Sequence, residues 1–564
     1  MKNSIIKGLA SVLAVASLAS CSSDYLEVAP QTAVTANLVH TTESGAQDAM
    51  YGLARAMYYP YTGSDVMSIL GVNGEPFIMM FYGDLYGQDY FSYLWGSQMG
   101  ANFTWETNRS QASYVCQIGW MYCYNLISQA NQILANIDNI DGNRDRLNFI
   151  KAQALTIRAH AYVRLLQIYG PRWEDSNNGE AYVCPLRLTP STGNAPLEKM
   201  SAVIAAIKSD LDEALELYDA RPSTINRSGA WEPDEDCARG VYARLGLLIH
   251  DYPVAQKMAK DARAPYQLLT AEQYKAGFAD VQSSNYLWAN PVAPTAYGLG
   301  YYAHGSYYAC QGPYPTEWEL GAGQINYELY RQIPQGDIRA DLFFTPDKLT
   351  KPTQLRESSF WNENICNPAN MNLTGNANMK IQLLQFGTKA IPGGDTKKFG
   401  QPYVSRSGEP TNPIIAFGAQ YKFWGLDMYG TNSFPYMRAE EMLLTEAEAA
   451  YYNGDYATAK SCLNSLLELR NPGQTVDALS GDALLDQIKL QRRIELWGEG
   501  LSWFDLKRWN QPMIRNIWEA GNVNSNNIPA SFKLEKQPTD PAWRFTVPQA
   551  ESQYNTAIDR SLID

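Results

Sequence analysis

The densest group of charged and aromatic side chains in this sequence lies near its end, in QRRIELWGEGLSWFDLKRWN, residues 491–510. These twenty residues include three Arg, one Lys, two Glu, one Asp and three Trp. In a cleft, such carboxylates and cations could perform acid–base chemistry, which requires a titratable group that stays unpaired and tunable. In the interior of a domain, the same residues would instead form a network of ion pairs.

The elements predicted around this stretch favour the interior network. Residues 480–497 can form a helix, with Ser480 as its N-cap and two Asp near its positive end. Gly498 and Gly500 would end that helix, and residues 502–509 could form a second one with apolar content. The stretch is therefore predicted to be a helix, a glycine turn and another helix.

Three charges of this region have the spacing of one helix face. Arg492, Glu495 and Glu499 are three and four residues apart, so their side chains can lie together. A charged side chain inside an apolar element must be paired, because an unpaired charge there has a large desolvation cost. We therefore predict a salt-bridge network that ties the two helices together, with a structural role.

Other catalytic and metal-binding patterns are absent from the sequence, and no cofactor or metal is expected. It has four scattered His and no H-E-x-x-H, G-x-S-x-G or P-loop motif; His160 and His250 are expected to be packed. The seven Cys beyond residue 21 include no C-x-x-C pair and are expected to be small buried hydrophobes. A glycoside hydrolase needs only two facing carboxylates, which spacing cannot exclude among 58 acidic residues.

The first twenty residues have the pattern of a secretory signal peptide. Two Lys precede an apolar run, residues 8–19, which is too short to span a bilayer. The following Leu18-Ala-Ser-Cys21 resembles a bacterial lipobox, which predicts that Cys21 becomes the acylated first residue. An ordinary signal peptide that ends near a Cys is the alternative. The net charge of -13 comes without a basic stripe, so nucleic acid is not an expected partner.

Apolar residues at helical spacing predict a mainly α protein. They mark helices at 46–59, 114–137, 147–169, 201–219 and 236–249. Residues 437–470 contain two more helical runs, with small residues where tetratricopeptide helix pairs have them, and residues 241–262 echo that pattern. Because one helix pair cannot bury both of its faces, we predict a stacked, tetratricopeptide-like scaffold rather than generic antiparallel helices.

Between residues 263 and 432 the helical periodicity is lost. This segment is rich in Gly, Pro, Asn and Tyr, which predicts long loops with short strands. Loops of that length in a compact protein are usually functional. We therefore expect a signal peptide (1–20), a tether (21–40) and a single domain (41–564), with helical repeats mainly in 41–262 and 433–510 and a loop-rich, mixed ligand-binding face from the insertion 263–432.

The stretch at 491–510 closely resembles the signature of the RagB/SusD family, the starch-utilisation-type surface lipoproteins of Bacteroidetes. The family pattern is roughly E-R-R-x-E-L-x-x-E-G-x-R-x-x-D-L-x-R-W. The matching positions are Arg492, Arg493, Glu495, Leu496, Glu499, Gly500, Asp505, Leu506, Arg508 and Trp509. Gln491 replaces the usual Glu and Ser502 replaces an Arg, which slightly changes the expected ion pairing.

Further blocks resemble the family, in the expected order, along nearly the whole mature chain. They are the start at Cys21, the helix containing Arg158 and Tyr169, the segment Asp337-Ile-Arg339, the block 434–449 and the closing block 545–555. The similarity is weakest in the long aromatic loops.

The resemblance implies a tetratricopeptide-helix scaffold anchored at the outer membrane by a lipid on Cys21, with a loop-rich face turned outward. It implies a binding protein that needs no cofactor and performs no catalysis. Such proteins capture oligosaccharides or polysaccharides and cover a SusC-like TonB-dependent transporter. Relatives tied to peptide uptake leave a peptide ligand open, a surface glycoside hydrolase is another alternative, and a structural lid without a ligand is the third.

Two aromatic loop segments are the candidates for glycan contact, because sugars stack on aromatic faces while polar neighbours bind their hydroxyls. One follows the block 83–89, which resembles the family's segment ahead of a sugar-contacting loop. The other, 298–318, follows 284–288, which is similar to a family strand before a second contacting region. The predicted ligand-binding residues are Tyr90, Tyr93, Trp95, Tyr302, Tyr307 and Trp318.

Overall fold

The computed structural model describes residues 41–58, 74–92, 103–275, 278, 285–290, 323–343, 420, 422–423, 433–517, 528 and 532–563. The predicted signal peptide, the tether with Cys21 and most of the insertion 263–432 lie outside these residues.

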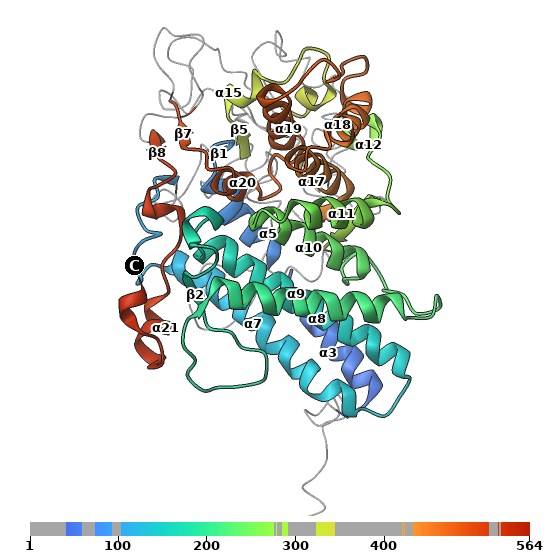
Figure 1. Ribbon diagram of the computed structural model, residues 1–564, viewed down its shortest axis with the longest axis vertical. Helices are drawn as coiled ribbons and strands as arrows, with labels where there is room; N and C mark the ends of the chain where they lie inside the picture. The colour runs from blue at the N-terminus through green and yellow to red at the C-terminus, as the bar shows by residue number, and fades with distance from the viewer. Residues whose placement is uncertain are drawn as a thin grey trace, which may run out of the picture.

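A stack of helices forms the scaffold (Figure 1). Helices α7 to α10 each pack on the helix that follows in the chain, α11 packs on α17, and α17 packs on α18 and α19. Helix α3 packs on α7 and α8. The bounds are α3 Glu43–Ala56, α7 Tyr114–Asn136, α8 Arg144–Tyr169, α9 Met200–Asp219, α10 Glu235–Leu248, α11 Tyr252–Arg263, α17 Ala439–Tyr452, α18 Tyr456–Arg470, α19 Asp482–Glu495 and α20 Ser502–Arg508.

The predicted helices are confirmed, with small shifts at their ends. Helix α3 begins three residues earlier than predicted, because the Thr42 hydroxyl accepts a hydrogen bond from Gly45 N at 3.0 Å and caps the helix. The prediction that Ser480 caps α19 is wrong. Gly481 holds that position with a φ of 53°, a left-handed conformation that glycine adopts without strain, and no side chain caps the helix there.

Two helix pairs, α10–α11 and α17–α18, form the predicted tetratricopeptide-like repeat. Ala255 and Ala459 are fully buried, and a Cβ at Gly246 would clash with Ala255, so the first pair needs a glycine at its crossing. In the second pair, Asp455 accepts a hydrogen bond from Thr458 N at 3.1 Å and caps α18. Because α11 packs on α17, the two pairs form one continuous array.

Helix α8 lies inside the scaffold and is buried on nearly all sides. Ala152, Ala159 and Ala161 are fully buried, and their small side chains let neighbouring helices approach closely. Arg158 binds Asp210 of α9 through Nε and Nη2 at 2.8 and 2.6 Å, so the buried charge is paired. The position of α8 explains why its sequence is apolar on more than one face.

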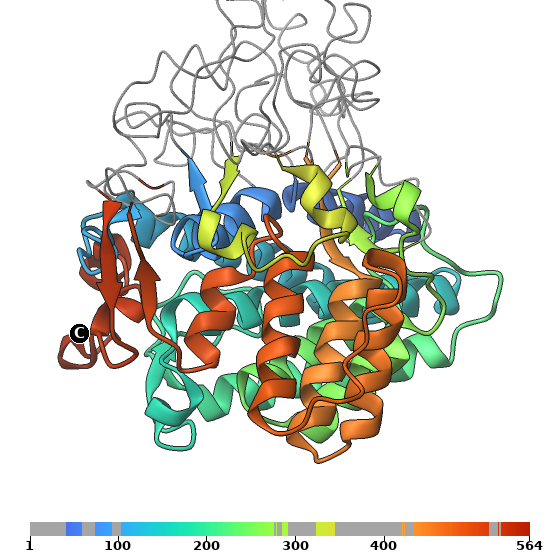
Figure 2. The same ribbon diagram turned by 90° about the horizontal axis from the view of Figure 1, so that it is seen from above.

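Short antiparallel ribbons attach other segments to the helices. In the described part they are β1 Tyr90–Ser92 with β5 Gly323–Ile325, β2 Tyr182–Cys184 with β3 Glu198–Lys199, β4 Tyr286–Ala289 with β6 Pro435–Arg438, and β7 Met513–Arg515 with β8 Leu534–Lys536. Strand β6 runs directly into α17, so its pairing holds β4 against the repeat array. Figure 2 shows β1 and β5 side by side along one face of the scaffold.

Several helical turns complete the fold. They are α5 Glu75–Ile78, the π-helix η2 Met79–Leu85, η3 Ile137–Asn139, η4 Trp173–Ser176, α12 Ala271–Lys275, α15 Tyr327–Tyr330, η6 Ile338–Leu342, η11 Pro541–Trp543, α21 Gln549–Tyr554 and η12 Arg560–Leu562. None of the helices within the described ranges combines the length and hydropathy that a membrane span needs. The five described Cys are free and buried, as predicted.

Candidate functional site

The 491–510 stretch contributes to a buried cluster of ion pairs around Glu495, at the end of α19. The two carboxylate oxygens of Glu495 accept hydrogen bonds from Arg339, Arg438 and Arg470 at distances of 3.0–3.4 Å. All four side chains are 0% exposed. Three cations from η6, β6 and α18 therefore meet on one carboxylate of α19.

Further carboxylates balance these cations. Glu440 accepts ion pairs from Arg438 and Arg470 at 2.7 and 3.2 Å, and Glu499 binds Arg438 and Lys422. The cluster contains as many carboxylates as cations: Asp337, Glu440, Glu495 and Glu499 face Arg339, Lys422, Arg438 and Arg470. Its net charge is thus zero, which is what a buried charged cluster needs to be stable.

Burial and pairing have opposite effects on the titration of this cluster. Burial alone would raise the pKa of Glu495, but the guanidinium groups of Arg470 and Arg438 lower that pKa below its usual range. Burial lowers the pKa of Lys422 to about 8, against the opposing attraction of Glu499. Glu495 therefore stays ionised at neutral pH and has no proton to give, so it does not fit the role of a general acid.

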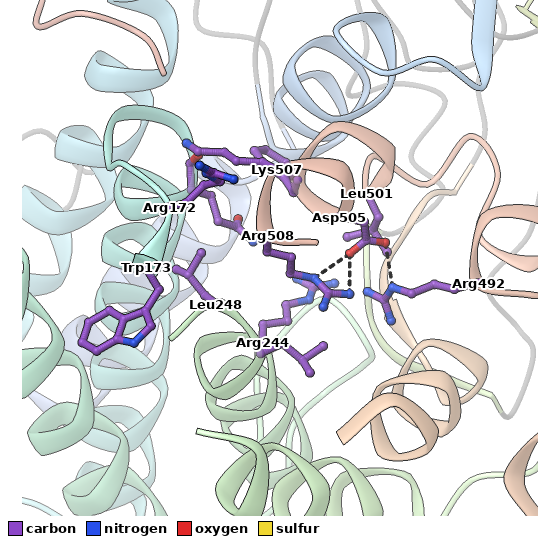
Figure 3. Close-up of a pocket in the computed structure, with 12 residues that line it drawn as sticks. Arg172, Trp173, Arg244, Leu248, Arg492, Leu501, Asp505, Lys507 and Arg508 are labelled. Carbon is purple, nitrogen blue, oxygen red and sulfur yellow. Dashed lines mark hydrogen bonds and ion pairs between the residues drawn. The ribbon is translucent and has the colours of Figure 1, made fainter. Parts of the chain in front are cut away.

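Arg492 and Asp505 join α19 to α20, as predicted. Arg492 Nε donates to Asp505 Oδ2 at 2.7 Å, and Arg508 Nε donates to Asp505 Oδ1 at 2.9 Å. Arg508 also forms a bidentate pair with Glu448 of α17. Figure 3 shows Arg492 and Arg508 directed at the same carboxylate. The interpretation of this stretch as a structural network is therefore confirmed.

Arg493 extends from α19 in another direction and holds the residue before β1. Its Nε and Nη2 donate to Asp89 at 3.0 and 2.6 Å, and the Ser502 hydroxyl donates to the same carboxylate at 3.1 Å. Gln491, the other departure from the family signature, accepts a hydrogen bond from Arg339 at 2.6 Å. Both departures therefore keep a polar contact within the network.

A polar groove of about 370 Å³ lies beside Arg493, where the chain before β1 meets α15 and β7. Its volume is in the range of small-ligand sites. Most of its lining side chains end in an amide, a carboxylate or a guanidinium group: Gln88, Asn326, Glu328, Gln332, Arg493, Gln511, Pro512, Ile514 and Asn516.

Hydrogen bonds hold several of these groups in place. Asn516 Nδ2 donates to Glu328 Oε1 at 2.9 Å, and Asn326 Nδ2 donates to Gln88 O at 2.7 Å. The Gln88 side chain accepts from Ile514 N at 3.3 Å. The groove thus contains both donor and acceptor groups, several of them held in place, which suits a ligand rich in hydroxyl groups.

The predicted ligand-binding residue Tyr90 lies in β1, next to this groove. It is only 2% exposed, and its ring centroid is 5.9 Å from that of Trp497. The other predicted residues lie outside the described part of the chain: Tyr93, Trp95, Tyr302, Tyr307 and Trp318. Strand β1 ends at Ser92, directly opposite Gly323 where β5 begins, so the segments that carry Tyr93 and Trp318 join the described structure at neighbouring points. Their contact with a ligand stays a prediction.

The amide groups of the groove were not predicted. They come from three segments, around residues 88, 326–332 and 511–516. The first lies in the block 83–89, which resembles a family segment, and the other two have no recognised motif. The capping residue Asn326, whose side chain accepts from Glu328 N at 2.8 Å, is the one local signal that could have indicated α15. By contrast, His160 is packed as predicted, 1% exposed and 3.1 Å from Glu75.

Comparison with known protein families yields two matches. A profile of the SusD family matches residues 418–560, which include Glu495 and its partners Arg438 and Arg470. A profile described as starch-binding and associating with the outer membrane matches residues 81–229, which include β1 and helices α7 to α9. No curated protein sequence matches the chain.

Solved structures share the fold over almost the whole chain. A SusD-like carbohydrate-binding protein from Bacteroides vulgatus is 21% identical, with a TM-score of 0.67 over 92% of this chain and 98% of that one. A SusD superfamily protein from Bacteroides thetaiotaomicron is 19% identical, with a TM-score of 0.66 over 92% and 99%. A SusD-like carbohydrate-binding protein from Bacteroides fragilis is 16% identical, with a TM-score of 0.61 over 91% and 98%.

Sequence and structure agree on both sides of the loop-rich insertion. The signature residues form the buried network that holds α17, α19 and α20 together, and the tetratricopeptide-like array is the fold of the SusD-like structures. Two separate family profiles match on either side of the loop-rich insertion. The chain therefore belongs to the RagB/SusD family.

Proposed function

We propose that the protein is a glycan-binding lipoprotein of the cell surface, which captures an oligosaccharide or polysaccharide for import. The observation that supports this best is the polar groove beside β1, lined by amides, a carboxylate and a guanidinium group. Family membership agrees with it, since one matching profile is described as starch-binding.

Sugar recognition requires a polar surface for the hydroxyl groups and an aromatic surface for the C–H faces, and we propose a part of the molecule for each. Hydroxyl groups need both donors and acceptors, and Glu328, Gln332 and Asn516 of the groove carry such groups. The apolar C–H faces of a sugar need aromatic rings. We propose that Tyr93, Trp95 and Trp318 supply these rings, because their segments join the scaffold at the ends of β1 and β5.

Binding without catalysis is part of the proposal. Glycoside hydrolysis uses two carboxyl groups that flank the scissile bond. Among the described residues that line the groove, Glu328 is the one carboxylate. The carboxylates of the signature stretch are buried in ion pairs, where they have no access to a polysaccharide.

The position in the cell follows from the predicted N-terminus. We propose that acyl chains on Cys21 anchor the protein in the outer membrane and that residues 21–40 connect this anchor to a single domain, 41–564, facing outward. The proposed partner is a SusC-like TonB-dependent transporter, on which the protein would sit as a lid. The association with the outer membrane agrees with the description of the second family profile.

The test is binding of the purified protein to a panel of polysaccharides in affinity gels, with calorimetry on oligosaccharides of any that bind. We expect one glycan class to bind, and we expect Trp95→Ala and Trp318→Ala to weaken binding about five- to 150-fold, since stacking of a ligand on an aromatic ring contributes about 1–3 kcal/mol. Tyr554→Ala is the matched control, because Tyr554 is 79% exposed and lies on α21.

Each alternative predicts a different result. Binding of peptides and of no glycan would identify a peptide-capturing member. New reducing ends after incubation with a polysaccharide would identify a hydrolase. Binding of neither class of ligand would favour a structural lid.

A further inference from the structure

A small internal cavity lies behind the signature stretch, between α8, α10, α19 and α20. Its volume is about 30 Å³, enough for one or two water-sized species. Gln167, Trp173, Leu247, Leu248, Leu501 and Phe504 form its less charged walls. The cavity is separate from the polar groove, because the two share no lining residue.

The charged lining of this cavity is mostly cationic. Arg172, Arg244, Arg492, Lys507 and Arg508 line it together with one carboxylate, Asp505. Figure 3 shows Asp505 engaged by Arg492 and Arg508, while Arg172 and Lys507 lie together on another side of the cavity. Outside the lining, Arg172 pairs with Asp175, Arg244 with Glu441 and Arg508 with Glu448.

Among the cations that line the cavity, Lys507 is the one that forms no ion pair with a carboxylate of the described residues. Its ammonium group donates to the carbonyl oxygens of Gln167 and Gly170, both at 2.7 Å. Five cations thus face four carboxylates, so the region has one positive charge in excess when Lys507 is protonated. This contrasts with the neutral cluster around Glu495.

Two guanidinium groups of the lining have an N–H group without a partner. Arg172 binds Asp175 through Nε and Nη2, at 2.7 and 3.0 Å, and its Nη1 has no hydrogen-bond partner. Arg244 binds Glu441 through Nε and Nη2, both at 2.7 Å, and its Nη1 is likewise unpaired. Arg172 is 6% exposed and Arg244 is 5% exposed, so bulk water does not serve these groups. Buried donors of this kind normally have a partner.

We propose that this cavity binds a small monovalent anion of the size of chloride. The anion would accept hydrogen bonds from the unpaired guanidinium N–H groups and offset the excess positive charge. The cavity volume of about 30 Å³ has room for an anion of this size. Burial lowers the pKa of Lys507 well below its usual value, and Arg544 and Arg172 lower it further; a bound anion would act against that shift.

The role of the anion would be structural. The cavity contacts the ends of α8 and α10 and both helices of the signature stretch, so an anion there would hold four elements together by charge-assisted hydrogen bonds. This inference does not depend on the glycan-binding function, because the cavity lies apart from the groove.

Bromide, which replaces chloride and scatters X-rays anomalously, provides the direct test. Crystals of the protein soaked in sodium bromide are expected to show an anomalous peak in the cavity, in hydrogen-bonding contact with Nη1 of Arg172 or Arg244. Water density without anomalous signal would overturn the proposal.

A solution experiment tests the effect on stability. At equal ionic strength, sodium chloride is expected to raise the unfolding temperature by about 1–2 °C relative to sodium gluconate. Arg172→Gln should abolish this difference, and it strands no buried carboxylate because Asp175 is 48% exposed. Arg239→Gln removes a carboxylate-paired Arg away from the cavity and should keep the difference. An equal chloride effect in both variants would contradict the assignment to this cavity.

Discussion

The cluster around Glu495 and the groove around Glu328 both collect polar side chains from distant parts of the chain, but they use them differently. In the cluster, each carboxylate faces cations and the central side chains are completely buried. In the groove, amides dominate, and the lining residue Ile514 is 41% exposed. The first region satisfies its own charges, and the second presents donors and acceptors outward.

This difference separates stability from recognition. A buried network can hold segments together only if its charges are balanced within the protein, because water cannot compensate them. A binding surface needs groups whose hydrogen-bonding capacity remains available to a ligand. The stretch 491–510, which looks most like an active site in the sequence, therefore belongs to the scaffold. The candidate binding site is the groove, whose amide side chains form no recognisable pattern in the sequence.

The largest effect is expected from Glu495→Gln, which breaks the charge balance of the cluster. The variant keeps the shape of the side chain but leaves Arg339, Arg438 and Arg470 with one carboxylate fewer. We expect a loss of about 3–5 kcal/mol in the free energy of unfolding, measured by urea denaturation. Glu468→Gln, on the exposed side of α18, should change this free energy by less than about 0.5 kcal/mol.

The glycan affinity of Glu495→Gln distinguishes the role of the cluster from that of the groove. Under conditions where Glu495→Gln is folded, its affinity should equal that of the wild type, because the side chain does not reach the groove. A stable Glu495→Gln variant without glycan binding would move the functional site back to the signature stretch.

The second effect is a loss of stability in acid. Burial alone would raise the pKa values of four buried carboxylates, but neighbouring cations keep them below the ordinary 4.5: Glu75, Glu441, Glu448 and Glu495. As the pH falls below 4.5, the unfolded chain therefore binds protons before the folded protein does. Stability that is present above pH 4.5 should be lost progressively, by about 1.4 kcal/mol for each unit of pKa difference.

Urea denaturation at pH 4.5, 4.0 and 3.5 measures this loss. Asp236 acts in the opposite direction: burial raises its pKa to about 7, so protonation of the folded state adds stability as the pH falls from 7 to the ordinary value of 3.8. The series starts at pH 4.5 because most of that gain is complete there, and the four glutamates outweigh the remainder. Glu495→Gln lacks one of the four carboxylates and should lose stability less steeply. A free energy of unfolding that stays constant down to pH 3.5 would contradict the pairing described for these groups.

The helices of the scaffold could be predicted from the sequence, whereas the residues of the groove could not. Apolar periodicity reports which helix faces are buried, so α7 to α10 could be predicted nearly to the residue. A salt-bridge network between the two neighbouring helices could be predicted, although not its pair Arg492–Asp505. The partners of Glu495 could not, since Arg339 lies 156 residues away and meets it only through tertiary packing.

The groove is still harder to predict, because its residues share neither a motif nor a period. Gln88, Glu328 and Asn516 come together through the β1–β5 ribbon, α15 and the chain around β7. Amide side chains are common in loops, so their presence does not distinguish a binding site from an ordinary surface.

The smallest effect expected is that of Gln332→Ala, and it tests the groove itself. Gln332 is exposed at the end of α15, where its Nε2 donates to Glu328 O at 2.9 Å, and its truncation leaves no buried group unpaired. Loss of one hydrogen bond to a sugar should weaken binding about three- to tenfold, equivalent to about 1 kcal/mol. The free energy of unfolding should change by less than about 0.5 kcal/mol.

Gln132→Ala on the exposed side of α7 is the matched control, since it removes the same amide from a helix surface away from the groove. Calorimetric titration of both variants with the glycan that the panel identifies gives the comparison. If both variants bind as tightly as the wild type while Trp95→Ala does not, the aromatic segments alone recognise the glycan and the groove is only a neighbouring surface. If only Gln332→Ala weakens glycan binding, the groove is part of the binding site. A residue of a recognition surface changes affinity without changing stability, whereas a residue of the balanced cluster around Glu495 changes stability without changing affinity.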